Sequence, residues 1–570
     1  MKLSTINQRA RAVLELVKHA QRSGIPENAA ETVLDRPQDR LLLRELASNS
    51  VVLLKNDNNV LPFKKDQRIA VIGPNARIAT YCGGGSASLN AYRAVTPYDG
   101  IRALAQGTVD FAQGVYSHQF LPLLGDSLRT PGGRAGFIIR TFNDPVSVRS
   151  RIALEERVLK GSNMFFIDYN HPKLEPVWYA ETEGIFTPEV SGTYDFGVCV
   201  QGTAELFVDE QKIVSNVNNQ RPGSSFLGNG TAEEIGSLHL EAGKPYTITV
   251  QWGCSKTSRL KKPGTVDFGK GGLRFGACRR LDSANAIREA VELASKVDQV
   301  IIFAGLSGEW ETEGEDRTTM DLPPGSDSLI SKVLDANPNA VIVCQSGTPV
   351  RMPWIQKARA VLQAWYGGNE AGNAIADVVY GDVNPCAKLP LTFPRDLRDT
   401  PSYFNMRSEG GRILYGEDVY VGYRYYEATE IEPLFPFGHG LSYTTFALSD
   451  LHVTLDNKSL QVSCELENTG SIAGAEVVQV YVAPPLSTLI RKPVKELKGC
   501  SKRNLDPQYR AFVEVDLDLL RATSFWEEKE GRWCSLAGTY RVLVGTSSIG
   551  VFLESSFELE HTTTWLGTQG

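Results

Sequence analysis

The 570-residue sequence predicts an α/β domain combined with two all-β domains. Two separated stretches alternate apolar runs with helical patterns, which is typical of a parallel sheet covered by helices on both faces. The stretches between and after them alternate apolar and polar residues with a period of two, which is typical of antiparallel strands with one solvated face. The 59 basic and 66 acidic residues give a net charge of −7, and this acidic balance argues against a nucleic-acid partner.

The predicted α/β domain is discontinuous and comprises residues 46–132 and 279–400. In its first part, IAVIGPNA contains a short β-branched strand that ends at Gly73. In its second part, the strands QVIIFAG, AVIVCQ and AVLQAW alternate with helical patterns such as SANAIREAVELASKV. Because ligands bind at the carboxyl ends of parallel strands, the loops after Gly73, Gly305 and Gln345 are expected to carry the functional site.

The remaining residues are predicted to form an N-terminal helical segment, two β-domains and a connector. Residues 133–278 are an inserted antiparallel β-domain, residues 401–445 a connector rich in Tyr and Gly, and residues 446–565 a second β-sandwich. Residues 1–45 begin with an amphipathic helix without the apolar core of a secretory signal, so a cytoplasmic location is the default expectation, and secretion stays possible if residues precede this sequence. The apolar runs are too short to span a membrane, so no membrane partner is expected.

The most unusual segment is the acidic loop that follows the strand QVIIFAG. Six acidic residues lie within thirteen positions of the sequence: Glu309, Glu311, Glu313, Glu315, Asp316 and Asp321. Composition alone favours a solvated loop. The alternative is that neighbouring negative charges raise the pKa of one carboxyl, which then donates a proton at neutral pH. An acid of this kind protonates the leaving oxygen when a glycosidic bond is cleaved.

Other site types find little support in the sequence. The loop Gly83-Gly84-Gly85 follows a strand, but it lacks the motifs of phosphate-binding loops, so we expect a close approach of two backbones there instead. The seven histidines show no metal-ligand spacing, and G-x-S-x-G is absent. The nine cysteines are scattered singly and are expected to be free thiols. No metal or organic cofactor is predicted.

Several long blocks, found in a fixed order, resemble glycoside hydrolase family 3 and specifically its β-glucosidases. They are SVVLLKN, IAVIGPNA, GGGSAS, GEWETEGEDR, QSGTPV, QAWYGGNEAGNAIADVVYGDVNPCAKLPLTF and FPFGHGLSYTTF. The inserted domain is similar to the protective-antigen-type β-domain of one branch of that family, and the last domain to its fibronectin-III-like domain. The resemblance implies retaining hydrolysis of terminal non-reducing β-D-glucosyl residues, with a β-glucoside or oligosaccharide as substrate and no cofactor.

The resemblance also implies roles for individual residues. The general acid/base of the family is the first Glu of an E-G-x-D-R block, which is Glu313 here, with Glu311 and Glu309 as the alternatives. In the related branch the inserted β-domain can supply an aromatic side chain to the leaving-group side, and Phe226 is the similar position. A plain hydrophobic residue at the edge of a turn is an equally good interpretation of Phe226.

One part of the family pattern is not found in this sequence. Family members carry an N-terminal (β/α)₈ barrel of about 250 residues, whose Asp in an S-D-W block is the nucleophile. Only about 50 residues precede SVVLLKN, and TINQRARAVLELVKHA resembles the helical segment that leaves the barrel. No nucleophile can therefore be named. Either this is a β-glucosidase whose barrel was lost from the gene model or lies on a separate polypeptide, or it is a catalytically inactive relative that binds carbohydrate or forms complexes.

Overall fold

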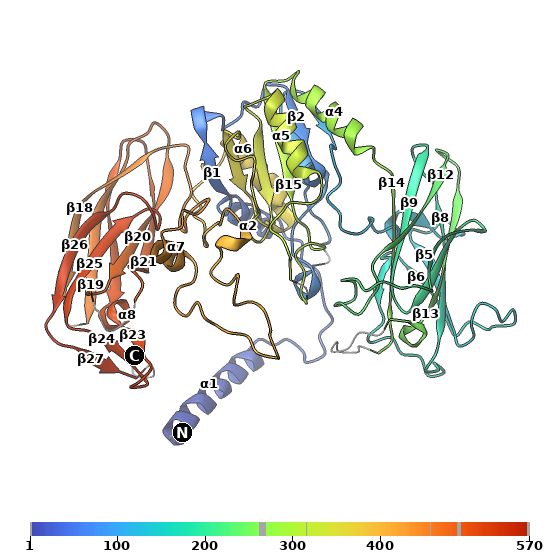
Figure 1. The fold of residues 1–570 in the computed structure, drawn as a ribbon, viewed down its shortest axis with the longest axis horizontal. Coiled ribbons are helices and arrows are strands. Elements are labelled where there is room, and N and C mark those ends of the chain that lie inside the picture. The colour runs from blue at the N-terminus through green and yellow to red at the C-terminus, as the bar shows by residue number, and fades with distance from the viewer. Residues whose placement is uncertain are drawn as a thin grey trace. The chain divides into compact units, whose positions relative to one another are not determined.

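The computed structural model describes residues 3–89, 91–260, 269–314, 316–456, 458–486 and 492–566 (Figure 1). The chain divides into two units, residues 1–43 and 44–570, which are described separately. The first unit contains α1 (Leu3–Arg22), which confirms the predicted N-terminal helix and has no buried residue. The division falls within α2 (Pro37–Ser48). No helix among the described residues combines the length and the apolar character that crossing a membrane requires.

The α/β domain of the second unit is built on one six-stranded sheet with the order β1-β17-β16-β15-β2-β3. Its strands are β1 (Val52–Asn56), β2 (Ile69–Ile72), β3 (Val109–Ala112), β15 (Gln299–Gly305), β16 (Val341–Gln345) and β17 (Ala360–Gln363). Strands β17 to β3 run parallel, as predicted, whereas β1 pairs with β17 in the antiparallel direction. The carboxyl ends of the parallel strands therefore share one edge of the sheet.

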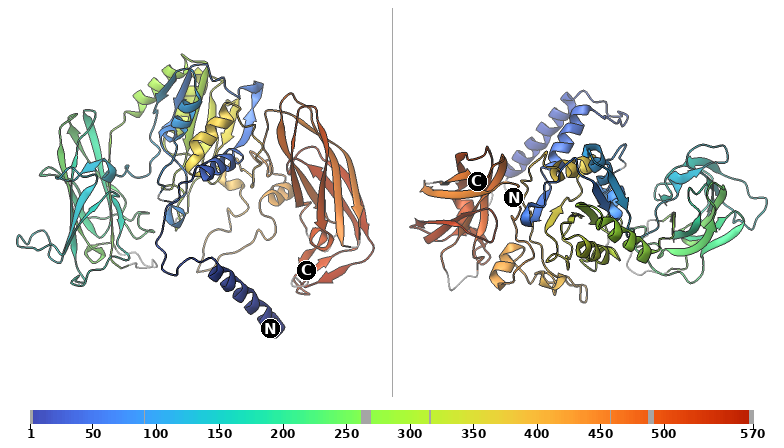
Figure 2. Two further views of the ribbon diagram at one scale, coloured as in Figure 1. Left: turned by 180° about the vertical axis from the view of Figure 1, so that it is seen from behind. Right: turned by 90° about the horizontal axis from the view of Figure 1, so that it is seen from above.

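Helices cover both faces of this sheet (Figures 1 and 2). Helices α4 (Ser283–Ala294) and α5 (Ser326–Ala336) pack on the face that carries Ile72, Ile302 and Ile342. Helices α3 (Pro97–Leu104) and α6 (Ala371–Val379) pack on the face that carries Val71, Ile301 and Val343. Because successive strand residues point to opposite faces, both faces are apolar only if the strands are continuous apolar runs. This explains the pattern seen in the sequence.

The segment between β3 and α4 forms two antiparallel sheets that share one core. One sheet has the order β11-β10-β13-β8-β5-β6, with β4 paired to β8, and the other has the order β12-β9-β14-β7. The strands are β4 (Leu128–Arg129), β5 (Phe137–Phe142), β6 (Glu155–Leu159), β7 (Asn163–Phe165), β8 (Tyr179–Phe186), β9 (Gly192–Gln201), β10 (Thr203–Val208), β11 (Gln211–Asn216), β12 (Glu234–Leu240), β13 (Tyr246–Gly253) and β14 (Gly272–Arg279). Large apolar side chains from both sheets, including Phe137, Phe196 and Trp252, fill the core between them.

The C-terminal segment forms a second antiparallel sandwich after a connector that contains α7 (Tyr423–Thr429). One sheet comprises β18 (Phe446–Leu455), β19 (Ser459–Asn468) and β22 (Arg510–Asp518), and the other β20 (Gly474–Ala483), β21 (Glu496–Leu505), β25 (Gly538–Gly545) and β26 (Leu553–Leu559). Short elements complete it: α8 (Leu519–Thr523), β23 (Phe525–Glu527), β24 (Arg532–Ser535) and β27 (Thr563–Trp565). All nine cysteines of the chain have free thiols.

Candidate active site

The acidic loop, residues 306–325, connects β15 to α5 and lies at the carboxyl edge of the parallel sheet. The loops that follow β2, β16 and β17 reach the same edge, so residues far apart in the sequence contact the acidic loop there. Three glutamates of the loop have three different sets of partners. Of the acidic residues named from the sequence, Glu315 lies outside the described residues.

Glu311 fastens the acidic loop to the loops after β16 and β17. Its carboxylate accepts hydrogen bonds from the backbone N–H of Gly347 at 2.6 Å and from the hydroxyls of Thr348 and Tyr366. The side chain is only 11% exposed, and the guanidinium of Arg317 lies 3.6 Å away. Burial and the bond to this carboxylate both raise the pKa of Tyr366, so the phenol stays protonated and keeps donating. The carboxylate of Glu311 is therefore engaged in anchoring the acidic loop to these two neighbouring loops.

Glu309 turns toward the segment that leads into the inserted β-domain. Its Oε2 accepts hydrogen bonds from the backbone N–H of Gln119 at 3.0 Å and from that of Phe120 at 3.4 Å. Its Oε1 accepts a hydrogen bond of 2.8 Å from the guanidinium of Arg274, which lies on β14. Like Glu311, this carboxylate already has its hydrogen-bonding capacity in use.

Glu313 is the most exposed of the three and lies near the tip of the loop. Its carboxylate accepts a hydrogen bond of 2.8 Å from the backbone N–H of Ser86, and hydrogen bonding at Ser86 lowers the pKa of Glu313 below its ordinary value. The prediction that neighbouring charges raise this pKa is therefore wrong for the chain as described. The neighbouring carboxylates Glu309 and Glu311 are directed to cations and hydrogen-bond donors of their own, and an exposed carboxylate is not destabilised by burial.

The Gly-rich loop packs its backbone directly against the acidic loop. The N–H of Gly84 donates to the carbonyl of Glu311 at 2.8 Å. A Cβ atom on Gly84 would lie 2.0 Å from the carbonyl oxygen of Gly308, and one on Gly85 would lie 2.4 Å from Cβ of Glu313. Gly85 also has a φ of +67°, a region that other residues rarely adopt. The predicted close approach of two backbones is confirmed, and it leaves space for glycine only.

Phe226 lies on the loop between β11 and β12, with a φ of +56° and a side chain that is 9% exposed. Its ring centroid is 5.4 Å from that of Phe165, and a Cβ atom on Gly272 would lie 2.5 Å from the ring. The next residue, Leu227, reaches toward the acidic loop, since its Cδ2 lies 3.5 Å from the Cβ position of Gly314. The Phe226 ring is thus largely packed within the β-domain, while its loop borders the acidic loop.

Glu313 borders two clefts. The first has a volume of about 870 Å³ and an apolar wall formed by Ile78, Leu89, Phe120, Leu123, Phe165, Phe226 and Leu227. The second, of about 940 Å³, includes Glu311, Asp316, Tyr366 and Tyr426 in its walls. Among the described residues, every carboxylate in the walls of these two clefts comes from the acidic loop: Glu309, Glu311, Glu313 and Asp316. The described part of these clefts therefore presents carboxylates from one side only.

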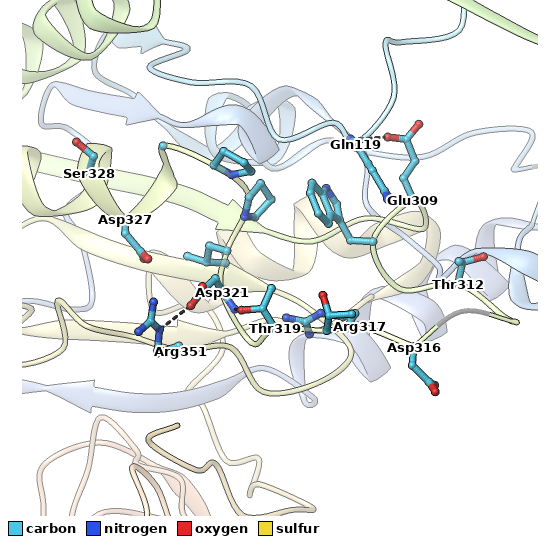
Figure 3. A pocket seen from close by; sticks show the side chains of 16 residues that line it. Gln119, Glu309, Thr312, Asp316, Arg317, Thr319, Asp321, Asp327, Ser328 and Arg351 are labelled. Atoms are coloured by element: carbon cyan, nitrogen blue, oxygen red, sulfur yellow. Dashed lines mark hydrogen bonds and ion pairs between the residues drawn. The ribbon is translucent and has the colours of Figure 1, made fainter. Parts of the chain in front are cut away.

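A third cleft, of about 490 Å³, also borders the acidic loop (Figure 3). Figure 3 shows Glu309 beside Gln119 on its wall, and the ion pair between Arg351 and Asp321, which has an N–O distance of 2.5 Å. Glu313 does not line this cleft. Across the described ranges of the chain, no group of three His, Cys, Asp or Glu side chains gathers as metal ligands would.

Two further charged residues, which the sequence analysis did not single out, lie behind Glu309. Arg274 and Glu233 are 6% and 8% exposed, and their Nη1 and Oε1 atoms are 3.2 Å apart. Burial raises the pKa of Glu233 to about 7. The available signal was the arginine in the apolar strand GGLRFGAC, because a charge in a buried strand requires a partner. Nothing in the sequence identifies Glu233 as that partner.

Comparison with known proteins gives the family. Residues 51–443 match the model of the "Glycosyl hydrolase family 3 C-terminal domain", and residues 476–548 match the "Fibronectin type III-like domain". The chain belongs to glycoside hydrolase family 3. It is 55% identical over 571 residues to "Probable beta-glucosidase I" of Aspergillus clavatus and 54% identical to the protein of that name in Aspergillus fumigatus. Each alignment covers 99% of this chain and 68% of the relative.

Solved structures of the family are similar as well. The "Beta-glucosidase from Kluyveromyces marxianus in complex with glucose" superposes with a TM-score of 0.91 at 41% identity, covering 99% of this chain and 68% of that one. DesR, "a beta-glucosidase from Streptomyces venezuelae in complex with D-glucose", has a TM-score of 0.65 at 27% identity and covers 94% of this chain and 62% of its own. The resemblance to glycoside hydrolase family 3 is thus confirmed. The chain spans about two thirds of the length of these relatives, and the roles of Glu313 and Phe226 stay predictions.

Proposed function

We propose that this chain is part of a β-glucosidase that releases terminal non-reducing β-D-glucosyl residues with retention of configuration, with Glu313 as general acid/base. The observation that carries the proposal is the position of Glu313. In a family-3 chain, it lies in the E-G-x-D-R block at the carboxyl edge of the sheet, exposed to two clefts, while Glu309 and Glu311 are held by other groups. The relatives named as β-glucosidases, two of them solved with glucose, support this substrate class.

In the proposed reaction, Glu313 first protonates the oxygen of the leaving group and then removes a proton from the incoming water. A general acid must hold its proton at the working pH, yet the pKa of Glu313 is lowered in this chain. Covering the cleft with the sugar and placing a second carboxylate near the same carbon both raise the pKa of an acid. We therefore infer that Glu313 becomes a competent acid only when the site is closed around the substrate.

A retaining glycosidase needs two carboxyl groups about 5 to 5.5 Å apart, one of which attacks the sugar. In the part of the chain that the structure describes, the carboxylates that line the two clefts come from one loop, and one loop does not reach both faces of the sugar ring. The sheets among the described residues are one open α/β sheet and several antiparallel sheets. We infer that the nucleophile belongs to the family's (β/α)₈ barrel, carried outside the residues described here, either by the same protein or by a barrel-bearing polypeptide.

The cleft that Glu313 shares with the inserted β-domain suggests where the leaving group binds. Its wall toward the β-domain is apolar and includes Phe165, Phe226 and Leu227. A wall of this kind suits an aryl group or the apolar face of a second sugar. We assign the leaving group of a β-glucoside or oligosaccharide to this side, with Phe226 as the aromatic contact.

The second candidate function is a catalytically inactive relative that binds carbohydrate or forms complexes. The lowered pKa of Glu313 favours it, because a carboxyl that is ionised at neutral pH cannot donate a proton. This alternative predicts that glucose or a disaccharide binds to the chain, and that no turnover appears when a barrel is supplied.

The test uses a fragment of the Aspergillus clavatus relative, taken from the part that this chain does not cover, which the family resemblance predicts to contain the barrel. The mixture is assayed with an aryl β-glucoside, and the anomer released first is identified by NMR. We expect β-glucose first from the unmodified chain, and loss of turnover in Glu313→Ala. With an activated aryl glucoside, azide should restore turnover of this variant, because it attacks the glycosyl-enzyme intermediate without a general base and releases β-glucosyl azide. Glu292→Gln, on the exposed surface of α4, is the control. Binding without turnover in the mixture would support the alternative instead.

A further inference from the structure

We propose that Arg274 and Glu233, which belong to the inserted β-domain, are positioning residues for the acidic loop and set its orientation through Glu309. The catalytic part of this inference rests on the proposed role of Glu313, which lies four positions after Glu309 in the same loop. The structural part does not depend on it. The group formed by Arg274, Glu233 and Glu309 is called the charge cluster below.

Arg274 lies at the centre of the charge cluster. Its guanidinium lies 3.2 Å from the carboxylate of Glu233, donates to that of Glu309 at 2.8 Å, and donates to the carbonyl of Leu121 at 2.9 Å. Its guanidinium carbon also lies 4.8 Å from the ring centroid of Phe120. The planar fork of an arginine can serve several acceptors in fixed directions, which a lysine ammonium on a flexible stem does less well.

Glu233 is held in place by the inserted domain itself. Its Oε2 accepts a hydrogen bond of 2.9 Å from the backbone N–H of Leu121. A Cβ atom at Gly197 on β9 would lie 2.4 Å from Oε1 of Glu233, so the carboxylate occupies the space that any other side chain at position 197 would need. Arg274 thus lies on β14 and Glu233 directly before β12, and both side chains are almost fully buried.

The charge cluster and the acidic loop enclose one segment, residues 117–122, from two sides. The acidic loop contacts it through Glu309 and through the indole N–H of Trp310, which donates to the carbonyl of Ser117 at 2.5 Å. Strand β14 contacts it where the N–H of Ala277 donates to the carbonyl of Pro122 at 2.9 Å. Figure 3 shows the junction of Glu309 with Gln119. A continuous chain of polar contacts therefore joins the β-domain to the loop of Glu313.

A charged junction of this kind is not required for stability alone. Apolar residues of similar volume commonly stabilise a buried junction as well as an ion pair does, whereas removing one partner of a buried ion pair is costly. One arginine between two carboxylates also leaves one negative charge in excess, so the charge cluster responds to protonation. We infer that its function is to fix one orientation of the acidic loop relative to the β-domain that borders the leaving-group side.

Among the described residues, few other titratable groups face the charge cluster. The thiols of Cys199 and Cys278 face Glu233, and burial raises the pKa of each thiol to about 12, so neither ionises near neutral pH. His118 faces Glu309 and Arg274, and burial lowers its pKa, so the imidazole is already neutral where a histidine ordinarily titrates. Glu233, with a pKa raised to about 7, is therefore the group that changes charge near neutral pH. Its ionisation is expected to loosen the acidic loop.

Hydrogen exchange on the purified full chain tests the structural part. Arg274→Met keeps most of the side-chain volume and removes the charge, so we expect at least tenfold faster amide exchange in residues 307–321, partly restored in Arg274→Lys. The matched control is Arg151→Met, which breaks a half-buried ion pair with Glu181 in the same β-domain, with an N–O distance of 2.6 Å. Equal exchange of the loop in Arg274→Met and Arg151→Met would overturn the proposal.

A spectroscopic signature separates positioning from a general loss of stability. In chain labelled with 5-fluorotryptophan, the ¹⁹F resonance of Trp310, assigned with Trp310→Phe, is expected to shift with pH with a midpoint near 7. The shift should vanish in Glu233→Gln, while the buried Trp354 stays unaffected in both proteins. A titration of Trp310 that persists unchanged in Glu233→Gln would contradict the role of this carboxyl, even if Arg274→Met fails to fold.

The catalytic part is measured separately, in the mixture with the barrel-bearing fragment. Arg274→Met is expected to lower kcat about tenfold for glucosides with poor leaving groups and to change KM little. An altered loop with unchanged kcat would contradict the catalytic part of the proposal. Neither hydrogen exchange nor the ¹⁹F shift needs turnover, so a wrong assignment of Glu313 would leave both of those results standing.

Discussion

The chemistry of Glu313 is decided by a bond that its own sequence neighbourhood does not reveal. The sequence shows a dense group of negative charges, from which a raised pKa follows only if the charges face one another. In the folded chain Glu309 faces Arg274 and Glu311 faces Tyr366, while Glu313 accepts from Ser86, 227 positions away in the sequence. The identity of the candidate acid could be predicted from the E-G-x-D-R block, but its electrostatic environment could not.

Glu233 gives a prediction for stability. Its pKa is raised from 4.5 to about 7, so the folded chain holds a proton that the unfolded chain releases between these values. The free energy of unfolding contributed by this group is therefore present below pH 4.5 and is lost as the pH rises to 7, by at most about 3 kcal/mol. The free energy of unfolding is measured in urea at pH 5 and at pH 8. The difference between these two free energies should be smaller for Glu233→Gln than for the wild type. An identical pH dependence in both proteins would contradict the shift.

Gly85 gives a second prediction, with a control built into the chain. Gly85→Ala places a Cβ atom 2.4 Å from Cβ of Glu313 at a φ of +67°. Gly133→Ala has a similar φ of +82° with nothing within 4 Å, so it measures the backbone strain alone, about 1 kcal/mol. We expect Gly85→Ala to lower the free energy of unfolding by at least 1 kcal/mol more than Gly133→Ala, and to speed hydrogen exchange in the acidic loop. If both substitutions lower the free energy of unfolding equally, the Gly-rich loop and the acidic loop can move apart at no cost in free energy.

Among the elements, the parallel strands could be predicted because each is a continuous apolar run, which a sheet covered on both faces requires. The direction of β1 could not be predicted, because a short apolar run such as Leu53-Leu54 is compatible with parallel and with antiparallel pairing. The same limit applies to the acidic loop. Its place at the carboxyl edge follows from β15, but its attachment to Gly347 and Tyr366 depends on strand order, which the sequence does not display.

The attachment of the acidic loop can be tested at Tyr366. Tyr366→Phe removes one donor to the buried carboxylate of Glu311 and keeps the ring. Hydrogen bonds to charged groups contribute about 1.5 to 3 kcal/mol, so the urea midpoint should fall and the loop should exchange faster. Tyr81→Phe, whose exposed hydroxyl donates to the carbonyl of Leu89 at 2.9 Å, should change the midpoint little. If Tyr366→Phe lowers the urea midpoint no more than Tyr81→Phe does, Glu311 does not anchor the loop.

At the scale of the whole molecule, the connector exposes an unusual number of apolar side chains. Those more than 40% exposed are Phe404, Met406, Ile413, Leu414, Tyr415, Val419 and Val421. Exposed apolar surface of this kind marks contact sites with other proteins. We expect the chain to bind a hydrophobic dye and to self-associate at high concentration, and the double substitution Phe404→Ser, Tyr415→Ser to reduce both. A wild-type chain that stays monomeric and binds no dye would argue against a missing partner surface.

The central claim is that this chain holds one of the two carboxyl groups that the reaction needs. A lone general acid contributes about 10²- to 10⁴-fold, which is far below the total enhancement of a glycosidase. The most direct measurement is turnover of an activated aryl β-glucoside by the purified 570-residue chain, wild type beside Glu313→Gln, with and without the barrel-bearing fragment. We predict negligible turnover by the chain alone, and turnover in the mixture that Glu313→Gln lowers because the incoming water loses its general base. A glucoside with a poor leaving group, assayed beside the activated one, should not be turned over by Glu313→Gln at all. Rates of roughly 1 to 10³ s⁻¹ by the chain alone would contradict the account, because a second carboxylate would then have to lie within it.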